Sequence, residues 1–229
     1  MADDDTAPPR TVTLPASLKQ VAMDEIRRRI FARELKAGAR IDPDALGAEL
    51  GMSKIPVREA LSALVGEGIV ELIPRRGAFV VPLSKRDVED HYWMLAVISG
   101  RAAERAAETL SESALAELET LADAMEHATT ERQRDQAAFR FHSLINHAAQ
   151  SPRMTTVLRM LGTPLPLGLY ESHARLAADA DTEHRELLAA LRSRSPAAAR
   201  RAMEHHFMAG AEASIRALEA QGFWDESPS

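Results

Sequence analysis

Residues 46–61 read LGAELGMSKIPVREAL and carry the strongest local structural signals in the chain. Gly51 marks a tight turn between two short helical segments, and Ser53 can cap the second of them. From Val57 onward the apolar residues recur at spacings of three and four, which is typical of an amphipathic helix with one buried face. The stretch therefore predicts two short helices joined by a tight turn, the second of which ends at about Glu67.

The first of these short helices is predicted over residues 43–50, with Asp42 as its N-cap and a proline in its first position. A longer helix comes before it, because the apolar residues from Ser17 to about Ala37 keep the helical spacing. Gly38 stands where a helix C-cap is expected. Three helices are therefore predicted in the first third of the chain.

Two β-rich runs follow these helices. Residues 69–73 and 78–81 flank a turn that contains Gly77, a pattern typical of a hairpin. Three helices and a hairpin describe a winged helix-turn-helix, a DNA-binding architecture, over residues 17–83. Residues 1–16 are acidic and proline-rich and show no periodicity, so we expect a disordered tail.

The third helix and the hairpin turn supply candidate DNA contacts. Lys54, Arg58 and Ser62 fall on the side of the helix opposite to its apolar face. Arg58 can contact guanine with both branches of its guanidinium, and the helix start at Ser53 can bind a phosphate. The alternative is that these cations only solvate a helix face. The candidate DNA-contacting residues are Ser53, Lys54, Ile55, Pro56, Arg58, Ser62, Arg75, Arg76 and Gly77.

The chain changes character after Pro82. From Ser84 to Ala220 the residues Ala, Leu, Glu and Arg dominate, and no strand is predicted. Helix breaks are expected near residues 111, 129–130, 151–152, 162–164, 178–179 and 195–196, which gives six or seven helices. The predicted fold class is mainly α: a winged helix-turn-helix, an antiparallel all-helical bundle over residues 84–222, and a tail over residues 223–229.

Three histidines of the bundle stand on apolar helix faces. His142, His184 and His206 each share a helical face with Ala, Leu, Ile or Met residues. Inward-facing imidazoles need partners, and one divalent metal such as Zn or Ni can satisfy all three. The alternative is a pocket, filled by water or an organic ligand, that the histidines line. The candidate metal ligands are these three histidines, and the candidate effector-binding residues are His142, His184, His206, Asn146 and His173.

Composition limits the class of protein. The chain of 229 residues is 45% hydrophobic and 27% charged, as globular proteins are. It has no cysteine, which excludes a disulfide scaffold, a cysteine-ligated zinc finger, an iron–sulfur cluster and a thiol nucleophile. The first residues lack the apolar segment of a signal peptide, and no apolar run is long enough to cross a bilayer. We therefore expect a cytoplasmic protein with no membrane partner.

The charge is distributed unevenly along the chain. The formal net charge is −6, but residues 10–83 carry a net charge of +3 and residues 84–229 a net charge of −6. A basic front part attached to an acidic back part indicates that the front part binds a polyanion such as DNA.

A family resemblance is carried by LGAELGMSKIPVREAL (46–61), EGIV (67–70) and RRGAFV (75–80). Together these segments closely resemble the N-terminal domain of GntR-superfamily transcriptional regulators. The resemblance implies operator contacts by Ser53, Lys54 and Arg58, and by the wing around Gly77. Lys54 stands where the family usually has Arg, which exchanges a planar fork for a point charge. Asp44 stands where some members have a phosphate-contacting Arg, so that contact is not expected here.

A second resemblance is carried by the segments FH (141–142), SPRM (151–154), EHRELLAAL (183–191) and AAARRAM (197–203), with His206 after them. Through these segments the back part is similar to the FCD ligand-binding domain of the FadR branch of that superfamily. The resemblance implies an effector-binding and dimerisation domain that holds a metal with its histidines. Ala138 stands where members usually have an Asp ligand. Leu95 and Ser99 stand where Arg and Glu are often found, so an anionic ligand and a carboxylate-binding Arg are absent.

Three functions follow from these observations. The leading one is a ligand-responsive regulator, a repressor, with a small carboxylate or related metabolite as its effector. It binds double-stranded operator DNA as a homodimer, and the operator is palindromic because a two-fold dimer presents two recognition helices about one helical turn apart. A second is a metal-dependent enzyme built on the bundle, but its one nearby carboxylate, Glu183, is expected on another face from His184. A third is a DNA-binding scaffold that senses nothing. We expect that the protein is not an enzyme.

Overall fold

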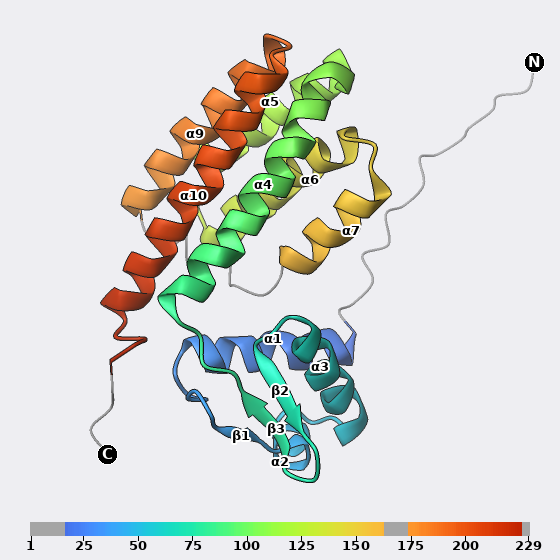
Figure 1. Cartoon of the computed structure of the whole chain (residues 1–229), viewed down its shortest axis with the longest axis vertical. Helices are drawn as coiled ribbons and strands as arrows, with labels where there is room; N and C mark the ends of the chain where they lie inside the picture. Colours follow the sequence, from blue (N-terminus) through green and yellow to red (C-terminus); the bar gives the residue numbers. More distant parts are fainter. Residues whose placement is uncertain (1–16, 163–173, 226–229) are drawn as a thin grey trace, which may run out of the picture.

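The computed structural model describes residues 17–162 and 174–225, arranged as a small N-terminal domain beside a helical bundle (Figure 1). The elements of the N-terminal domain are α1 (Leu18–Phe31), β1 (Arg40–Ile41), α2 (Pro43–Glu49), α3 (Lys54–Gly66), β2 (Val70–Ile73) and β3 (Gly77–Val80). The elements of the bundle are α4 (Lys85–Thr109), α5 (Glu112–Glu126), α6 (Glu131–Ala148), α7 (Pro152–Leu161), α9 (Ala174–Arg192) and α10 (Pro196–Ala220). The predicted fold class, mainly α with a winged helix-turn-helix and a helical bundle, is confirmed. The tail predicted over residues 1–16 lies outside the described residues.

The core of the N-terminal domain lies between α1, α3 and the sheet. Ile26 of α1 and Val57 and Leu64 of α3 are completely buried there. The predicted hairpin is observed as β2 and β3, which pair antiparallel. The sheet also has a third strand, β1, which pairs with the other side of β3 and was not predicted from the sequence. A strand of two residues is too short to show an alternating pattern.

The first helix is shorter than predicted. α1 ends at Phe31 rather than near Ala37, because Arg33 adopts the left-handed conformation, with φ 59°. Its guanidinium donates to the backbone carbonyls of Gly222 and Asp225 at the other end of the chain. Tertiary contacts therefore end a helix whose local sequence would continue it.

The start of the C-terminal tail is docked onto the N-terminal domain. The rings of Phe31 and Phe223 stack with centroids 6.0 Å apart. The indole N–H of Trp224 donates to the carbonyl of Leu83, in the connection between the two domains, at 2.7 Å. The chain between residues 222 and 225 thus contacts both α1 and the connecting segment.

The two longest helices of the bundle, α4 and α10, lie side by side and run antiparallel (Figure 1). Tyr92 is opposite Ser214, with their hydroxyl oxygens 2.8 Å apart, and Gly100 is opposite Glu204. A Cβ at Gly100 would stand 2.7 Å from the Cγ of Glu204, so a larger residue there would displace the Glu204 side chain.

Side-chain caps explain several helix starts of the bundle. Ser111, Thr130 and Ser151 each accept a hydrogen bond from a backbone N–H in the first turn of α5, α6 and α7, where helix breaks were predicted. The break predicted at residues 178–179 is wrong, because α9 continues from Ala174 to Arg192. Asp is only a weak helix breaker, and the surrounding alanines favour the helix. Among the helices of the described residues, none combines the length and the apolar character needed to span a bilayer.

Candidate DNA interface and candidate metal centre

α3 has one buried face and one exposed face. Val57, Ala60 and Leu64 are buried against the domain core, while Arg58 and Ser62 are exposed. Lys54 and Ile55 are also exposed at the start of the helix, and Pro56 is half-buried. The exposed face therefore carries the side chains that the sequence assigns to DNA.

The first turn of α3 differs from the expectation in one respect. Ser53 occupies the N-cap position, but its hydroxyl accepts no capping hydrogen bond. The backbone N–H groups at a helix start attract anions, and here no side chain caps them. The start of α3 is therefore open to a phosphate.

The cations of α3 are not equivalent. The Nζ of Lys54 lies 3.1 Å from the Oδ1 of Asp44 on α2, so a carboxylate already neutralises part of its charge. Arg58 makes no ion pair with any described residue. Of these two side chains, Arg58 is the one with an unopposed charge at the centre of the exposed face.

The turn between β2 and β3 gathers three guanidinium groups. Arg75 and Arg76 are exposed at the turn, and the guanidinium of Arg76 lies 5.3 Å from the centroid of the Phe79 ring. Gly77 has φ 108°, and a Cβ there would stand 3.3 Å from the Nε of Arg40. Arg40, which the sequence analysis missed because β1 has no visible pattern, places a further cation at the base of this wing.

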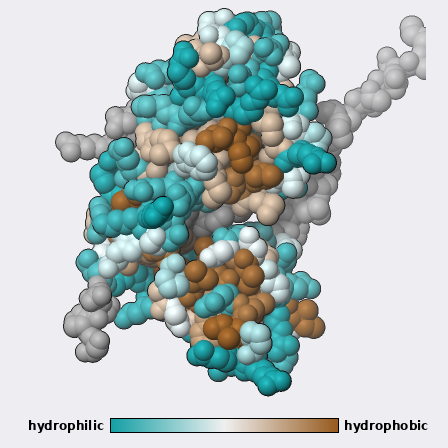
Figure 2. All heavy atoms as spheres, in the orientation of Figure 1, coloured by the Kyte–Doolittle hydropathy of each residue, from teal (hydrophilic) through white to brown (hydrophobic). Residues whose placement is uncertain are grey.

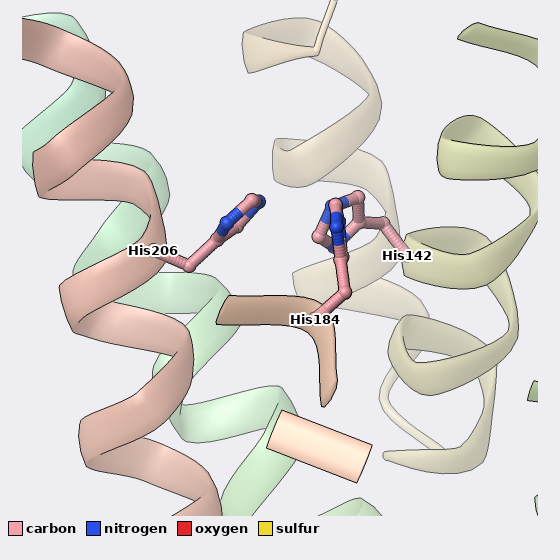
Figure 3. A group of neighbouring side chains, drawn as sticks. All are labelled: His142, His184 and His206. Atoms are coloured by element: carbon pink, nitrogen blue, oxygen red, sulfur yellow. The ribbon is translucent and has the colours of Figure 1, made fainter. Parts of the chain in front are cut away.

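The three histidines predicted as metal ligands come together in the bundle. His142 projects from α6, His184 from α9 and His206 from α10, and their rings point toward one another (Figure 3). One ring nitrogen from each lies within 4.8 Å of the other two. The Nε2 atoms of His142 and His184 are 3.2 Å apart. Residues more than 60 positions apart in sequence thus form one cluster.

The geometry of this cluster fits a divalent metal. Two imidazole nitrogens that bind one ion at about 2.0–2.1 Å and lie 3.2 Å apart subtend about 100° at it, between the octahedral and the tetrahedral angle. Burial, and then the neighbouring His206, lowers the pKa of His142 and His184 well below the usual value. Both imidazoles are therefore neutral at neutral pH, which is the form that binds a metal.

Glu183 orients the third ligand. Its Oε2 lies 2.8 Å from the Nδ1 of His206, and both side chains are buried. A carboxylate on one imidazole nitrogen directs the other nitrogen toward the site, as in the carboxylate–histidine–metal arrangement. The sequence places Glu183 on a different face from His184 and therefore did not predict this contact with α10.

A cavity of about 390 Å³ opens beside the histidines. Of the predicted effector-binding residues, His142, His206 and Asn146 line it, and His184 is not among its described lining residues. His173 lies outside the described residues. Leu95, Ser99 and Ala138 also line the cavity. The positions that lack the expected charged residues are therefore part of its wall.

Comparisons with known proteins agree with both halves of the chain. Residues 18–80 match the model of the bacterial regulatory proteins of the gntR family, and residues 90–209 match the FCD domain. The chain belongs to the FCD-containing regulators of the gntR family. The family and its named members are transcriptional regulators rather than enzymes, so this FCD regulator is a DNA-binding transcriptional regulator.

Individual relatives of this FCD regulator cover most of its length. The HTH-type transcriptional regulator McbR of Escherichia coli is 28% identical over 186 residues, which cover 78% of this chain and 84% of McbR. The HTH-type transcriptional repressor RspR of the same organism is 25% identical over 201 residues, 86% of this chain and 88% of RspR. The solved structure of E. coli McbR/YncC matches with a TM-score of 0.65 at 24% identity, covering 91% of this chain and all of that one, which shows a common fold.

Proposed function

We propose that this FCD regulator is a repressor that binds a palindromic operator in the cytoplasm as a homodimer and releases it when a small-molecule effector binds in the bundle. The observation that carries the proposal is the combination of two sites in one chain. An exposed, cation-bearing α3 lies in the N-terminal domain, and a buried histidine cluster borders a cavity in the bundle. The name of the relative RspR, a repressor, favours repression over activation.

Operator reading is assigned to α3 and the wing. A helix with Arg58 at its exposed centre fits the major groove, where a guanidinium can contact guanine with two hydrogen bonds. Arg40, Arg75 and Arg76 lie on the wing, where contacts to phosphates position the domain without reading sequence. The helix supplies specificity and the wing supplies affinity that depends on salt.

The homodimer is assigned to the outer face of α4. Trp93, Met94 and Val97 on this helix have exposed fractions of 57%, 39% and 38%, and Figure 2 shows hydrophobic side chains gathered on this side of the bundle. Two charged residues of this helix form a complementary pair in such a packing, since Arg86 and Glu108 are equally far in sequence from Val97 on its two sides. Two copies of α4 packed antiparallel about Val97 would bring each arginine to a glutamate of the other copy.

Metal and effector binding are assigned to the histidine cluster. His142, His184 and His206 would hold the ion, with Zn or Ni fitting the imidazole donors. A bound divalent ion supplies positive charge and open coordination positions at which a carboxylate can bind. Glu183 holds His206 in place, and the cavity admits the effector.

The response would reach the DNA-binding domain through a junction cluster, defined as Phe31, Val88, Tyr92, Leu95 and Leu158 with Phe223 and Trp224 packed against them. Tyr92 and Leu95 line the cavity and also belong to this cluster. Phe31 lies at the end of α1, whose other side packs on α3. A ligand that shifts α4 would therefore change the support of α1.

The test of operator reading compares two exposed arginines. We expect Arg58→Ala to weaken binding to an operator, selected from random-sequence DNA, by about 1–3 kcal/mol, or roughly 10- to 100-fold. Arg132→Ala, on the exposed surface of α6, is the matched control and should leave affinity unchanged. Fluorescence anisotropy at fixed salt measures both, and equal affinities for the two variants would refute the assignment of α3.

The metal is tested with two histidines of the same region. After reconstitution with Zn or Ni, we expect one ion per chain in the parent protein and none in His184→Ala. His147→Ala is the control, because His147 is exposed at the cavity and outside the cluster. Elemental analysis measures the metal content of each protein. We also expect His184→Ala to lose the response to the effector while it keeps its affinity for the operator. A parent protein that takes up no ion and still responds to an effector would assign the histidines to the pocket wall alone.

The dimer is tested by mass in solution. Trp93→Glu should convert dimer to monomer and weaken binding to a two-half-site operator, while Met208→Glu on α10 should remain a dimer. Light scattering behind size-exclusion chromatography measures both masses. A dimeric Trp93→Glu variant would place the interface elsewhere.

A further inference from the structure

The cavity beside the histidines has walls of a definite chemical character. Most of its lining is apolar, and the side chains that form these walls are Tyr92, Leu95, Ala138, Phe139, Leu158 and Phe207. They come from α4, α6, α7 and α10, so apolar groups face the cavity from all four helices. A ligand in this space would be surrounded by carbon over most of its surface.

Few charged groups face the cavity among the described residues. Arg159 is exposed, so its charge is screened by solvent at the opening, where His147 is exposed as well. Asp135 also lines the cavity, and burial raises the pKa of its carboxyl. In its ionised form that carboxyl repels a second anion. A second carboxylate of a ligand would therefore find no buried cation among the described lining residues.

Two polar atoms in the cavity wall have no partner. The Oγ of Ser99 and the Oδ1 of Asn146 are buried without a hydrogen bond to any described residue. Ser99 is 1% exposed. Because α4 and α10 run antiparallel with Gly100 opposite Glu204, Ser99 lies near the level of His206. A buried carbonyl oxygen without a donor is costly, so the Oδ1 of Asn146 indicates that a ligand donates a hydrogen bond there, while the hydroxyl of Ser99 can either donate or accept.

We propose that the cavity binds a monocarboxylic acid with an apolar body and one hydroxyl or amino group, and that it rejects di- and tricarboxylates. The inference rests on the proposed effector role of the cavity and specifies the chemical class of that effector. The carboxylate lies at the metal held by the histidines. The apolar body lies against Leu95, Phe139 and Leu158, and the donor group satisfies the Oδ1 of Asn146.

The size of the effect follows from the hydrophobic walls. Burying one methylene contributes about 0.8 kcal/mol. Because about 1.4 kcal/mol corresponds to a tenfold change in the dissociation constant, each buried methylene should tighten binding about fourfold. A series of butanoate, pentanoate and hexanoate should therefore bind about fourfold more tightly at each step. Adipate has the same chain length as hexanoate and a second carboxylate at its end. It should bind at least about tenfold more weakly, since that charge would lose water without gaining a partner.

Calorimetry on the full-length, Zn-loaded protein at fixed ionic strength measures this series. 2-Hydroxyhexanoate and 3-hydroxyhexanoate test the donor group, and one of them should bind more tightly than hexanoate. In the Asn146→Leu variant this hydroxy acid should bind no more tightly than hexanoate. Phe139→Ala should flatten the chain-length series, and it is safe for folding because Phe139 is 65% exposed. Val157→Ala, an exposed apolar residue of α7 outside the cavity lining, is the matched control and should leave the series unchanged.

The outcomes separate this proposal from the proposed function. Adipate or citrate binding more tightly than hexanoate overturns the proposal, as does the absence of binding by every acid to a protein that holds one Zn per chain. The metal content and the operator affinity of Arg58→Ala report on the proposed function independently. An acid series with the expected slope in a protein without metal supports the apolar ligand class and refutes the metal's part in holding it.

Discussion

An ion pair between α1 and the end of α3 holds α3 in place. The guanidinium of Arg27 donates to both carboxylate oxygens of Glu67, at 2.6 and 3.1 Å, and also to Asp24 at 2.8 Å. The side chains of Arg27 and Glu67 are only 9% and 13% exposed. Glu67 is the C-cap residue of α3, so this contact fixes the angle at which α3 is presented to DNA.

We expect Glu67→Gln to lower the free energy of unfolding of the N-terminal domain by about 2–4 kcal/mol. Removal of one partner from a buried pair costs about 3–5 kcal/mol, and here Asp24, which is 60% exposed, remains to compensate Arg27 in part. For a domain of this size the loss corresponds to a fall in Tm of about 10–20 °C in its transition. Operator affinity should fall as well, because α3 loses its support.

Thermal and urea unfolding, followed by circular dichroism, measure this change. Glu59→Gln is the matched control, since Glu59 is an exposed residue of α3 that makes no ion pair with any described residue, and it should change stability by less than about 0.5 kcal/mol. The double variant Arg27→Met, Glu67→Leu should recover much of the loss, because it leaves no buried charge unpaired. A loss below about 1 kcal/mol in Glu67→Gln would falsify the view that the pair supports α3.

Four further outcomes are expected. Asp44→Ala should tighten operator binding about three- to tenfold at low salt, with the gain fading as salt rises, because the charge of Lys54 is released; salt-dependent anisotropy measures it. Trp224→Ala should reduce the effector-dependent change in operator affinity by about 0.5–2 kcal/mol, because it loosens the junction cluster, and titrations with and without effector compare the two. Ala138→Asp should tighten Zn binding at least about tenfold by adding a carboxylate ligand, as read by competition with a chelator. Hydrogen bonds from neighbouring arginines lower the pKa of Glu25 from 4.5 to about 2, so Glu25→Gln should cost about 0.5–1 kcal/mol at pH 7, and the difference from the parent in urea titrations should shrink as pH falls from 4.5 toward 2.

The sequence predicts those elements whose signals are local. α3 follows from the apolar spacing after Val57, and α2 follows from its cap and its proline, because these features act within a few residues. The end of α1 and the strand β1 could not be predicted in this way. Arg33 ends α1 through contacts with residues near the other end of the chain, and β1 exists only because β3 offers a free edge. Both depend on segments that are distant in sequence.

The candidate site follows the same division. His142, His184 and His206 could be singled out because each shares a helical face with apolar neighbours, which directs it inward. The role of Glu183 could not, because the helical period predicts the face of a residue on its own helix and not the helix that this face meets. Arg40 was missed for the related reason that its value as a wing residue comes from the neighbouring strand. Residues that act by themselves are visible in the sequence, and residues that act through a partner are not.

The replacement of the usual anionic residue by Ala138 affects the charge that a bound metal would present to a ligand. With three imidazole ligands, which bring no negative charge, and Glu183 held against His206 on the outer side, a divalent ion would keep most of its positive charge. An anionic ligand is then attracted both by open coordination positions and by that charge, in a cavity where the wall supplies little other polar attraction. Affinity for the carboxylate would therefore depend on the metal, and discrimination among carboxylates would depend on Leu95, Phe139 and Leu158. Because Leu95 and Leu158 also belong to the junction cluster, the side chains that would select the ligand are ones through which its binding would act on α1.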